Sequence, residues 1–357
     1  MPSKKGKKPL SATQQRKKEH LALCLGDDIA GPLPASGLSH YTFVHNALPE
    51  TDIEDIDLTA TFLGRTLKAP LLISSMTGGF DMAGKVNRNL ARAAERLGLA
   101  MGLGSQRVAL EEPQVARSFQ VRDAAPNVLL LGNLGAVQLN YGYGIEECRR
   151  AVSMIQADGL ILHLNVLQEA VQPEGNRNFK GISAKIAEIC FQLEVPVVAK
   201  EVGSGISADV AKRLLEVGVR AIDVAGSGGT SWYAVEAKRA AREGEPVDDT
   251  FAGWGIPTEE TLVMVREAAP TLDLVASGGI RNGLDVAKAV ALGANLAGIG
   301  QPLLAPALES SDKVEEYLAR VIRELKIAML CVGAENLEAL RSVPLILRSA
   351  GGWQKIH

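Results

Sequence analysis

The sequence predicts a closed (β/α)8 barrel, the TIM-barrel fold, with extensions at both termini. Eight short runs of β-forming residues recur between residues 71 and 300, and helical segments with a 3.6-residue apolar period lie between them. This alternation indicates a parallel sheet. Eight strands favour closure into a barrel, because doubly wound open sheets more often have about six.

The predicted strands are apolar enough to be buried on both faces, as parallel strands are. The helical pattern between them is clearest in MAGKVNRNLARAAERLG, ISAKIAEICFQLE, ISADVAKRLLEVG and GLDVAKAVALG. The order predicts one barrel core over about residues 71–304. The strands are predicted at Leu71–Met76, Met101–Gly104, Val128–Leu134, Gly159–Asn165, Pro196–Val202, Ala221–Gly226, Leu272–Gly278 and Leu296–Gly300.

Segments outside the core complete a single domain, predicted over residues 16–357. Before the first strand, Gly64-Arg65 separates two apolar runs and predicts a small hairpin over the bottom of the barrel. In the C-terminal segment 305–357, Asp312–Gly333 and Glu335–Ser342 have the pattern of amphipathic helices.

Two further segments have a distinct composition. Residues 1–15 are rich in lysine and poor in large apolar residues, so a flexible basic tail is expected there. The connection Tyr233–Trp254 is the longest between strands, and a loop of that length predicts a functional loop or a lid.

Composition and charge narrow the classes of function. A net charge of −3 argues against general affinity for nucleic acid. No apolar run approaches the ~18 residues of a membrane span, and no secretory signal is expected, so the prediction is a cytoplasmic protein without a membrane or nucleic-acid partner. Cys24, Cys148, Cys190 and Cys331 form no CxxC pair and lie at no zinc-ligand spacing with histidine, so buried free thiols are expected.

Polar residues cluster where the predicted strands end. In barrels of this kind the active site lies at the C-terminal end, here called the mouth, so the residues just after each strand matter most. The stretch ILHLNVLQEA, residues 161–170, places His163, Asn165, Gln168 and Glu169 after a buried strand. His163 and Asn165 share one face because strand side chains alternate. We expect that face to point into the mouth, with Gln168 and Glu169 in the loop above it.

The last two strands are followed by glycine-rich turns. ASGGIRNG (276–283) and AGIGQPLL (297–304) place glycines where backbone amides can approach an anion closely. The loops after strands seven and eight form the usual phosphate site of this fold, and helix N-termini favour negative charge. The alternative is that these glycines only form tight turns. Their position in the fold favours a phosphate.

A phosphate at that position, a polar mouth and a lone lysine on strand five together suggest a flat phosphorylated cofactor such as flavin mononucleotide (FMN). Lys200 would then face the pyrimidine edge of the flavin, where its charge can stabilise an anionic reduced form. The alternative for Lys200 is an ion pair within the barrel, with Asp223 or Glu169 as its partner.

Taken together, these residues resemble the type 2 isopentenyl-diphosphate isomerases. The resemblance runs in order from residue 16 to about residue 304, and HLNVLQE and RKKEH are its most specific motifs. The motifs are RKKEH (16–20), SSMTGG (74–79), GSQR (104–107), GNLG (132–135), HLNVLQE (163–169), VVAKEVGSGIS (197–207), GGTSW (228–232), WGIPT (254–258) and SGGIRNG (277–283).

The resemblance implies interconversion of isopentenyl and dimethylallyl diphosphate with reduced FMN and Mg²⁺, NADPH serving only to reduce the flavin. It implies a homo-oligomer, a tetramer or octamer.

The resemblance also implies the following sites. FMN would meet Ser75, Met76, Thr77, Ser105, Asn133, Lys200 and Thr230, and its phosphate Gly279, Ile280, Arg281, Gly300 and Gln301. The diphosphate would meet Arg16, Lys17, Ser105, Gln106 and Arg107, with His163 and Asn165 nearby. Gln168 would lie beside the isoprenoid, and Trp232 would shield the isoprenoid tail. Glu169 would hold magnesium.

One departure from the family pattern is visible. Relatives usually read VSGAGGTSW, whereas this chain reads VAGSGGTSW, so Ala225 replaces a serine and one flavin contact is in doubt. Ser227 is a candidate to compensate, although it lies at a different position in the loop.

The implied reaction requires protonation of an unactivated alkene and removal of an allylic proton. No side chain in the mouth motifs is an obvious strong acid, and a carboxylic acid would need a strongly raised pKa. No cysteine lies at a strand end, so we expect reduced flavin to exchange the protons, with Gln168 orienting the substrate or relaying a proton. Two alternatives remain: an FMN-dependent 2-hydroxyacid oxidase or dehydrogenase on the same barrel, or a non-catalytic barrel.

Overall fold

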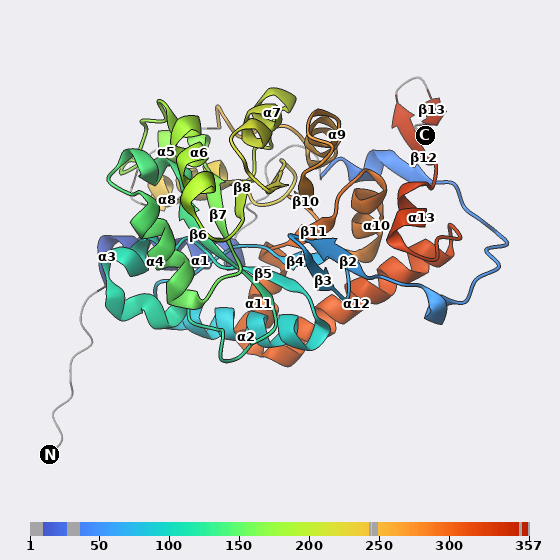
Figure 1. Ribbon diagram of the computed structural model, residues 1–357, viewed down its shortest axis with the longest axis horizontal. Coiled ribbons are helices and arrows are strands. Elements are labelled where there is room, and N and C mark those ends of the chain that lie inside the picture. The colour runs from blue at the N-terminus through green and yellow to red at the C-terminus, as the bar shows by residue number, and fades with distance from the viewer. Residues whose placement is uncertain (1–9, 27–35, 243, 245–248, 350–351, 356–357) are drawn as a thin grey trace, which may run out of the picture.

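The computed structural model describes residues 10–26, 36–242, 244, 249–349 and 352–355. The predicted fold is confirmed: eight parallel strands close into a barrel in the order β10-β11-β4-β5-β6-β7-β8-β9 (Figure 1). Each strand lies within one residue of, or inside, the run predicted for it. The strands are β4 (Leu71–Ile73), β5 (Ala100–Gly102), β6 (Leu129–Gly135), β7 (Gly159–Leu164), β8 (Val197–Glu201), β9 (Ala221–Asp223), β10 (Asp273–Ser277) and β11 (Leu296–Ile299).

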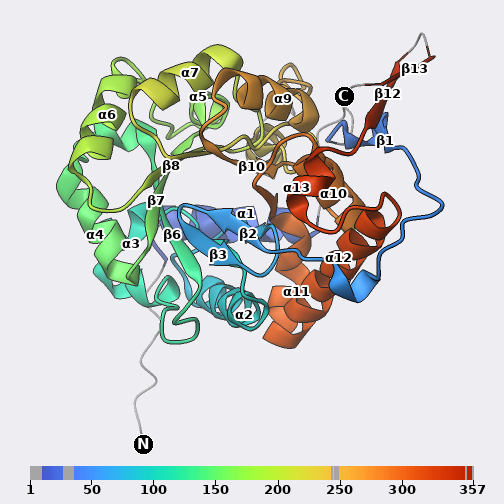
Figure 2. The ribbon, with the colours of Figure 1, turned by 45° about the vertical axis from the view of Figure 1, so that its right-hand side comes forward.

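Helices surround the barrel as a ring, which Figure 2 shows most clearly. Their inner faces pack on the strands and form one continuous apolar core with them. The helices that follow the strands in chain order are α2 (Asp81–Leu97), α3 (Arg107–Glu111), α4 (Ile145–Ile155), α5 (Val166–Val171), α6 (Ile182–Gln192), α7 (Ala208–Glu216), α8 (Trp232–Arg242), α9 (Thr258–Ala268), α10 (Gly283–Ala291) and α11 (Leu304–Glu309). Five 3-10 helices are η1 (Leu38–His40), η2 (Ile53–Asp55), η3 (Pro113–Ser118), η4 (Ala136–Asn140) and η5 (Gln301–Leu303).

The predicted hairpin is present as β2 (Ala60–Phe62) and β3 (Arg65–Leu67). The backbone amide of Leu63 donates to Asp273, and Arg65 pairs with Asp158; both acidic residues lie where barrel strands begin. The hairpin therefore covers the bottom of the barrel, as expected.

Helix α1 (Ala12–Gly26) lies over the opposite end of the barrel. Lys17 donates to the Ser105 carbonyl after β5, and the Cys24 carbonyl accepts from Gln301 after β11. The helix begins inside the range 1–15 that was expected to be a flexible tail; residues 1–9 of that range lie outside the described residues. N-terminal residues from Ala12 onward therefore form a wall of the mouth.

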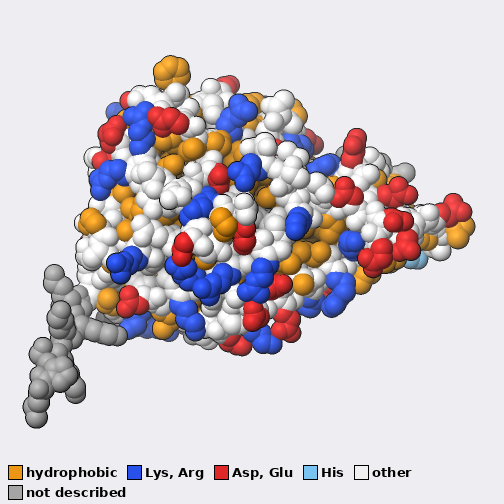
Figure 3. All heavy atoms as spheres, turned by 60° about the horizontal axis from the view of Figure 1, so that its bottom comes forward, with side chains coloured by type: hydrophobic (Ala, Val, Ile, Leu, Met, Phe, Trp, Pro, Cys, Tyr) orange, Lys and Arg blue, Asp and Glu red, His pale blue; other side chains and the backbone are white. Residues whose placement is uncertain are grey.

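The C-terminal segment forms the two expected helices, α12 (Ser311–Leu330) and α13 (Leu337–Arg341). It ends in β12 (Leu345–Ser349) and β13 (Gly352–Lys355), which form a small antiparallel sheet with β1 (Tyr41–Phe43) beside the ring of helices (Figure 2). On the face that carries α2 and α12, Lys and Arg side chains alternate with Asp and Glu (Figure 3). Arg96 of α2, for instance, pairs with Asp312 and Glu315 of α12.

The structure corrects the expectation of a long loop over Tyr233–Trp254. Its first half is helix α8, because AVEAKRAAR consists of good helix formers. The buried face of α8, which includes Glu236, packs toward the mouth rather than forming an open lid.

Candidate functional site

A cavity of about 340 Å³ opens at the mouth, a volume in the range of ligand pockets. Residues after all eight strands reach it, together with the inner face of α1. With one exception, every residue expected to act in catalysis or binding lines this cavity: Arg16, Lys17, Ser75, Met76, Thr77, Ser105, Arg107, Asn133, His163, Asn165, Gln168, Glu169, Lys200, Thr230, Trp232, Gly279, Ile280, Arg281, Gly300 and Gln301.

Gln106 is the exception. Its side chain is fully buried in the barrel wall, where Nε2 donates to the Ala151 carbonyl (2.8 Å) and Oε1 accepts from the Asn133 amide (2.9 Å). Both ends of the amide are occupied by backbone groups. Gln106 therefore fixes the loop after β5 against β6, and its contact with the diphosphate stays a prediction.

The floor of the cavity follows from strand register. His163 of β7 lies opposite Lys200 of β8, and Lys200 lies opposite Asp223 of β9. Partners in register point to the same side of a parallel sheet. The barrel thus places an imidazole, an ammonium and a carboxylate side by side.

Lys200 lies at the cavity and also forms an ion pair, and its contact with the flavin stays a prediction. It lines the cavity, and its Nζ lies 2.9 Å from Asp223 Oδ2, so the ion-pair partner is Asp223 and not Glu169. Ser277 completes the group by donating from Oγ to Asp223 Oδ1. The ion pair compensates the burial of both charges while leaving the lysine at the cavity surface.

His163 is neutral at physiological pH. Burial, followed by the charges of Lys200 and Lys17, lowers its pKa to about 4. Nδ1 lies 2.8 Å from Asn133 Oδ1, an acceptor, so Nδ1 carries the proton in the neutral ring. In this tautomer Nε2 is an acceptor, so neutral His163 does not donate a hydrogen bond to an anion.

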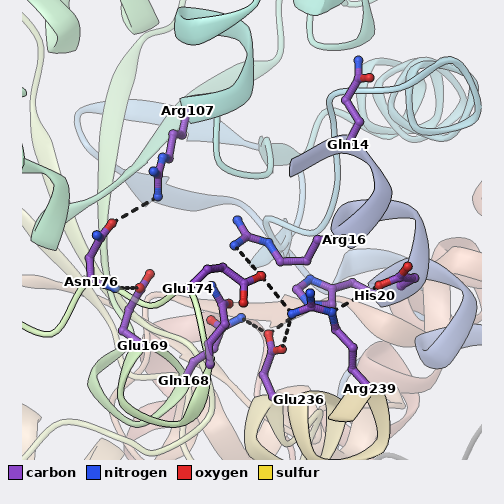
Figure 4. Close-up of polar contacts among 12 residues, drawn as sticks. Gln14, Arg16, His20, Arg107, Gln168, Glu169, Glu174, Asn176, Glu236 and Arg239 are labelled. Atoms are coloured by element: carbon purple, nitrogen blue, oxygen red, sulfur yellow. Dashed lines mark hydrogen bonds and ion pairs between the residues drawn. The ribbon is translucent and has the colours of Figure 1, made fainter. Parts of the chain in front are cut away.

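Gln168 and Glu169 were expected in a loop, but they lie on the short helix α5, which begins directly after Asn165. Asn165 Nδ2 donates to Gln168 Oε1 (3.2 Å) and to Glu169 Oε1 (3.1 Å). Gln168 Nε2 in turn donates to Glu236 Oε1 of α8 (3.2 Å). These bonds set the direction of both side chains at the cavity edge (Figure 4).

Glu169 is the best-placed carboxylate for a metal. Its Oε2 also accepts from the backbone amide of Asn176, whose side chain accepts from Arg107 (3.2 Å). Among the described residues, no group of three or more His, Cys, Asp or Glu side chains could hold a metal ion. A magnesium ion on Glu169 would therefore need oxygens from substrate phosphate and water, the pattern that Mg²⁺ commonly adopts.

The turn after β10 has the shape of an anion cradle. Gly278 and Gly279 have φ of 103° and 81°, in the left-handed region that favours glycine. A Cβ at Gly279 would lie 2.5 Å from the Gly228 carbonyl oxygen, so the space beside this turn admits only backbone. Of the amides expected to bind phosphate, that of Arg281 donates to Asp285 Oδ2 (3.1 Å).

Polar groups without partners indicate that the cavity fits a polar ligand. The buried hydroxyls of Ser74 and Ser75 and the buried Oδ1 of Asn165 have no hydrogen-bond partner within the described part of the chain. Buried polar atoms are rarely left unpaired unless a ligand or water satisfies them. Ser75 was expected to contact FMN, and this observation supports a flavin there.

Ala225, the departure from the family pattern, lines the cavity with a methyl group and no hydroxyl. Its φ of 36° lies in the left-handed region, which is unusual for alanine. Ser227 does not line the cavity, and its amide and carbonyl bind Ile256 and Thr258. Ser227 therefore gives no direct replacement for the lost hydroxyl.

Several residues of the site were not anticipated. His20 of α1 contacts Trp232 edge to face, with ring centroids 5.2 Å apart, and its Nε2 lies 3.0 Å from Glu236 Oε1. Cys24 also lines the cavity, but burial raises the pKa of its thiol to about 12, so it is a weak acid there. In the sequence, RKKEH offered a signal for His20, whereas Glu236 has the appearance of an ordinary helix-surface charge.

One buried carboxyl has a raised pKa without belonging to the cavity. Burial raises the pKa of Glu201 to about 7, although its Oε2 accepts from the amides of Val202, Gly203 and Ser204. This carboxyl shapes the loop after β8 and does not point at a ligand.

Comparison with known proteins gives two kinds of match. The FMN-dependent dehydrogenase family matches residues 19–122 and 177–346. Relatives named isopentenyl-diphosphate delta-isomerase include those of a Nostoc species, 52% identical over 92% of this chain and 94% of the relative, and of a Synechococcus species, 50% identical over 95% and 97%. The relative from Rickettsia felis is 48% identical over 93% and 96%.

Solved structures support the fold. A mandelate oxidase with (S)-2-phenylpropionate matches with a TM-score of 0.62 at 21% identity, covering 93% of this chain and 97% of that chain. A variant mandelate oxidase with 4-Br-2-hydroxy-methylphenylacetate has a TM-score of 0.65 at 20% identity over 94% and 99%. Separately, in the described residues no helix is long and apolar enough to cross a membrane.

Proposed function

The chain belongs to the FMN-dependent, type 2 isopentenyl-diphosphate delta-isomerases, and from this premise we propose how its mouth cavity serves the reaction. The enzyme interconverts isopentenyl and dimethylallyl diphosphate by a 1,3-proton shift, with FMN as its cofactor. One observation carries the proposed arrangement. The cavity combines a glycine cradle for one phosphate with a separate group of cationic side chains for a second anion.

FMN would lie across the strand ends, with its phosphate at the turns after β10 and β11. Reduced FMN, kept reduced by NADPH that is not consumed in each turnover, would supply the proton donor and acceptor for the shift. Lys200, held by Asp223, would place a positive charge beside the flavin. The unpaired hydroxyl of Ser75 and the amides of Gly279 and Ile280 would complete the contacts.

The substrate diphosphate would bind where Arg16, Lys17 and Arg107 meet. Arginine suits this task because its planar group binds phosphate through two hydrogen bonds. Neutral His163 would lie beside the diphosphate with Nε2 as an acceptor, not as a donor to its oxygens. Glu169 would hold Mg²⁺, which would offset the negative charge of the diphosphate; a single carboxylate holds magnesium weakly unless phosphate and water oxygens also bind it.

Side chains of the cavity would orient the isoprenoid and exclude water. Gln168 has its amide fixed between Asn165 and Glu236, so it can hold the substrate or relay a proton at one position. Trp232, packed against His20, would cover the apolar tail.

The 2-hydroxyacid oxidase reading has less support. Such an enzyme needs a base near the flavin, usually a histidine after strand seven, and the turn after β10 reads GGIRN. The family match to FMN-dependent dehydrogenases leaves out residues 123–176, where His163, Gln168 and Glu169 lie. That segment is thus where this chain departs from the general flavin barrel.

Product analysis tests the function. Isopentenyl diphosphate incubated anaerobically with the protein, FMN, Mg²⁺ and NADPH should yield dimethylallyl diphosphate, detected by chromatography. Omitting NADPH should stop the reaction. Absence of product in the complete mixture would sink the proposal, and oxidation of a 2-hydroxyacid would favour the rival.

The metal role of Glu169 has its own test. Glu169→Gln should raise the Mg²⁺ concentration for half-maximal activity roughly tenfold or more, while FMN titration stays unchanged. Glu194→Gln, which removes a surface carboxylate paired with Arg149, is the matched control. An unchanged Mg²⁺ requirement in Glu169→Gln would contradict the role.

Two properties of the whole protein also belong to the proposal. We infer a cytoplasmic enzyme, because four free cysteines suit a reducing compartment. We also infer a homo-oligomer, a tetramer or octamer. The partly exposed Ile327 of α12 supports an assembly, and light scattering on the purified protein measures its size.

A further inference from the structure

Glu174 lies beside the mouth without lining the cavity. It belongs to the turn between α5 and α6, and its Oε1 accepts from Arg16 Nη1 (3.3 Å) and Arg239 Nη1 (2.9 Å). Figure 4 shows the carboxylate between the two guanidinium groups. Glu174 therefore joins a residue of α1, expected to bind diphosphate, to a residue of α8.

The turn that carries Glu174 is fixed in place. A Cβ at Gly175 would lie 1.9 Å from the Glu169 carbonyl oxygen, so this turn packs directly on the end of α5. On its other side, the Asn176 amide donates to the Glu169 carboxylate. The position of Glu174 is thereby tied to the rigid end of β7 and α5.

Helix α1 meets this turn through one face. Arg16, Glu19 and His20 are spaced i, i+3 and i+4, so their side chains share a side of the helix. Glu19 accepts from Arg239 Nε (3.2 Å), and His20 pairs with Glu236. Arg239 thus contacts both α1 and Glu174, and Glu174 completes a three-way bridge between α1, α8 and the turn.

An isolated surface ion pair would contribute little. Here the side chains of Arg16 and Arg239 are each only 16% exposed, and Arg239 pairs with three carboxylates. Burial raises the pKa of Glu174, but a backbone amide and the two guanidinium groups stabilise its carboxylate and bring the pKa below its usual value. These features distinguish the bridge from a solvated pair.

We propose that Glu174 is a positioning residue that holds Arg16, and with it α1, at the place where Arg16 meets the substrate diphosphate. This inference rests on the proposed function, which supplies the diphosphate. Because Glu174 does not line the cavity, its loss should weaken substrate binding and leave the chemical step unchanged.

Glu174→Gln tests the inference, since glutamine keeps the shape of the side chain and removes its charge. The KM for isopentenyl diphosphate should rise about tenfold, as loss of one charge-assisted hydrogen bond predicts, with kcat close to that of the wild type. Glu194→Gln breaks a comparable Arg–Glu pair away from the mouth and should leave both constants unchanged.

A second readout needs no turnover. Without substrate, trypsin should cut after Arg16, Lys17 and Lys18 faster in Glu174→Gln than in the wild type or in Glu194→Gln, as followed by mass spectrometry. Equal cleavage rates and an equal KM would overturn the inference, as would a fall in kcat at unchanged KM. If the wild type forms no dimethylallyl diphosphate, the proposed function fails, while the trypsin comparison still tests the bridge.

Discussion

At the scale of single residues, Lys17 has the most unusual electrostatic setting in the mouth. Its Nζ donates to the Ser105 carbonyl (2.7 Å) and lies 5.4 Å from the centre of the Phe119 ring. Burial, followed by the charges of Arg16 and Arg107, lowers its pKa to about 7. In the unfolded chain the pKa of Lys17 is 10.5, so between pH 7 and pH 10.5 folding releases a proton from Lys17. The burial of Lys17 therefore destabilises the folded state less as the pH rises through this range.

Binding of an anion beside Lys17 should reverse this shift. At pH 8, isopentenyl diphosphate added to the protein with oxidised FMN should cause net uptake of up to about one proton per site, with much less at pH 6 where Lys17 is already charged. Calorimetry in buffers of different ionisation enthalpy measures the uptake. Lys17→Met should lose it; equal uptake in the variant would show that another group titrates.

At the scale of elements, the turn after β10 has a backbone shape that suits the proposed binding of a phosphate. Gly279 combines a φ of 81° with a neighbouring carbonyl that leaves no room for a side chain. The turn is further fixed by Thr258, whose Oγ1 donates to the Gly278 carbonyl (2.6 Å). An anion there is met by backbone amides in a fixed geometry.

Gly279→Ala should therefore weaken FMN binding roughly tenfold or more, because the turn must move away from Gly228 to admit a methyl group. Flavin fluorescence titration measures the change. Gly142→Ala is the matched control: its φ is 88° and nothing lies within 4 Å of its Cβ position, so it shares the backbone strain without the contact. Equal FMN affinity in the two variants would contradict the cradle.

The elements also show what the sequence could predict. Barrel strands are local apolar runs and could be found one by one, and the rule that barrel chemistry lies at strand ends then placed most of the site. The direction of a side chain could not be found in this way: Gln106 follows β5 as Ser105 and Arg107 do, yet it points into the wall. Helix α8 was read as a loop because its polar composition, without tertiary packing, resembles a solvated segment.

Residues that act through other residues were hardest to predict. Glu174, Glu236 and Arg239 are common surface types, and the folded arrangement of α1, α8 and the end of α5 gives them their partners. The sequence separation between Arg16 and Glu174 is 158 residues, so no local pattern reports their contact. Such bridges depend on the closed fold.

At the scale of the whole molecule, the barrel separates its tasks between its two ends. The hairpin β2–β3 closes the bottom, and α1 covers the mouth. Strand β1 pairs with β12, so the N-terminal and C-terminal segments support each other outside the ring of helices. The ligand-facing polar groups can therefore be concentrated at one end, while the apolar core runs through the remainder.

The four cysteines lie in different parts of the molecule and differ in their burial. Cys24 and Cys148 are buried, Cys190 is half-buried and Cys331 is exposed, so the expectation of buried thiols holds for the first two and is wrong for Cys331. Burial raises the pKa of Cys24 and Cys148 to about 12 and that of Cys190 to about 11. Because the thiolate is the reactive form, these three thiols should be nearly inert in the folded protein.

An aromatic disulfide reagent should therefore label one thiol rapidly in the native protein and all four after denaturation in guanidinium without reductant. Cys331→Ser should remove the fast reaction and leave isomerase activity unchanged, since Cys331 lies beyond α12 and far from the mouth in sequence and fold. Rapid labelling of Cys24 would show that α1 leaves the mouth readily and would contradict its buried setting. Fewer than four thiols after denaturation would contradict the free state of the cysteines.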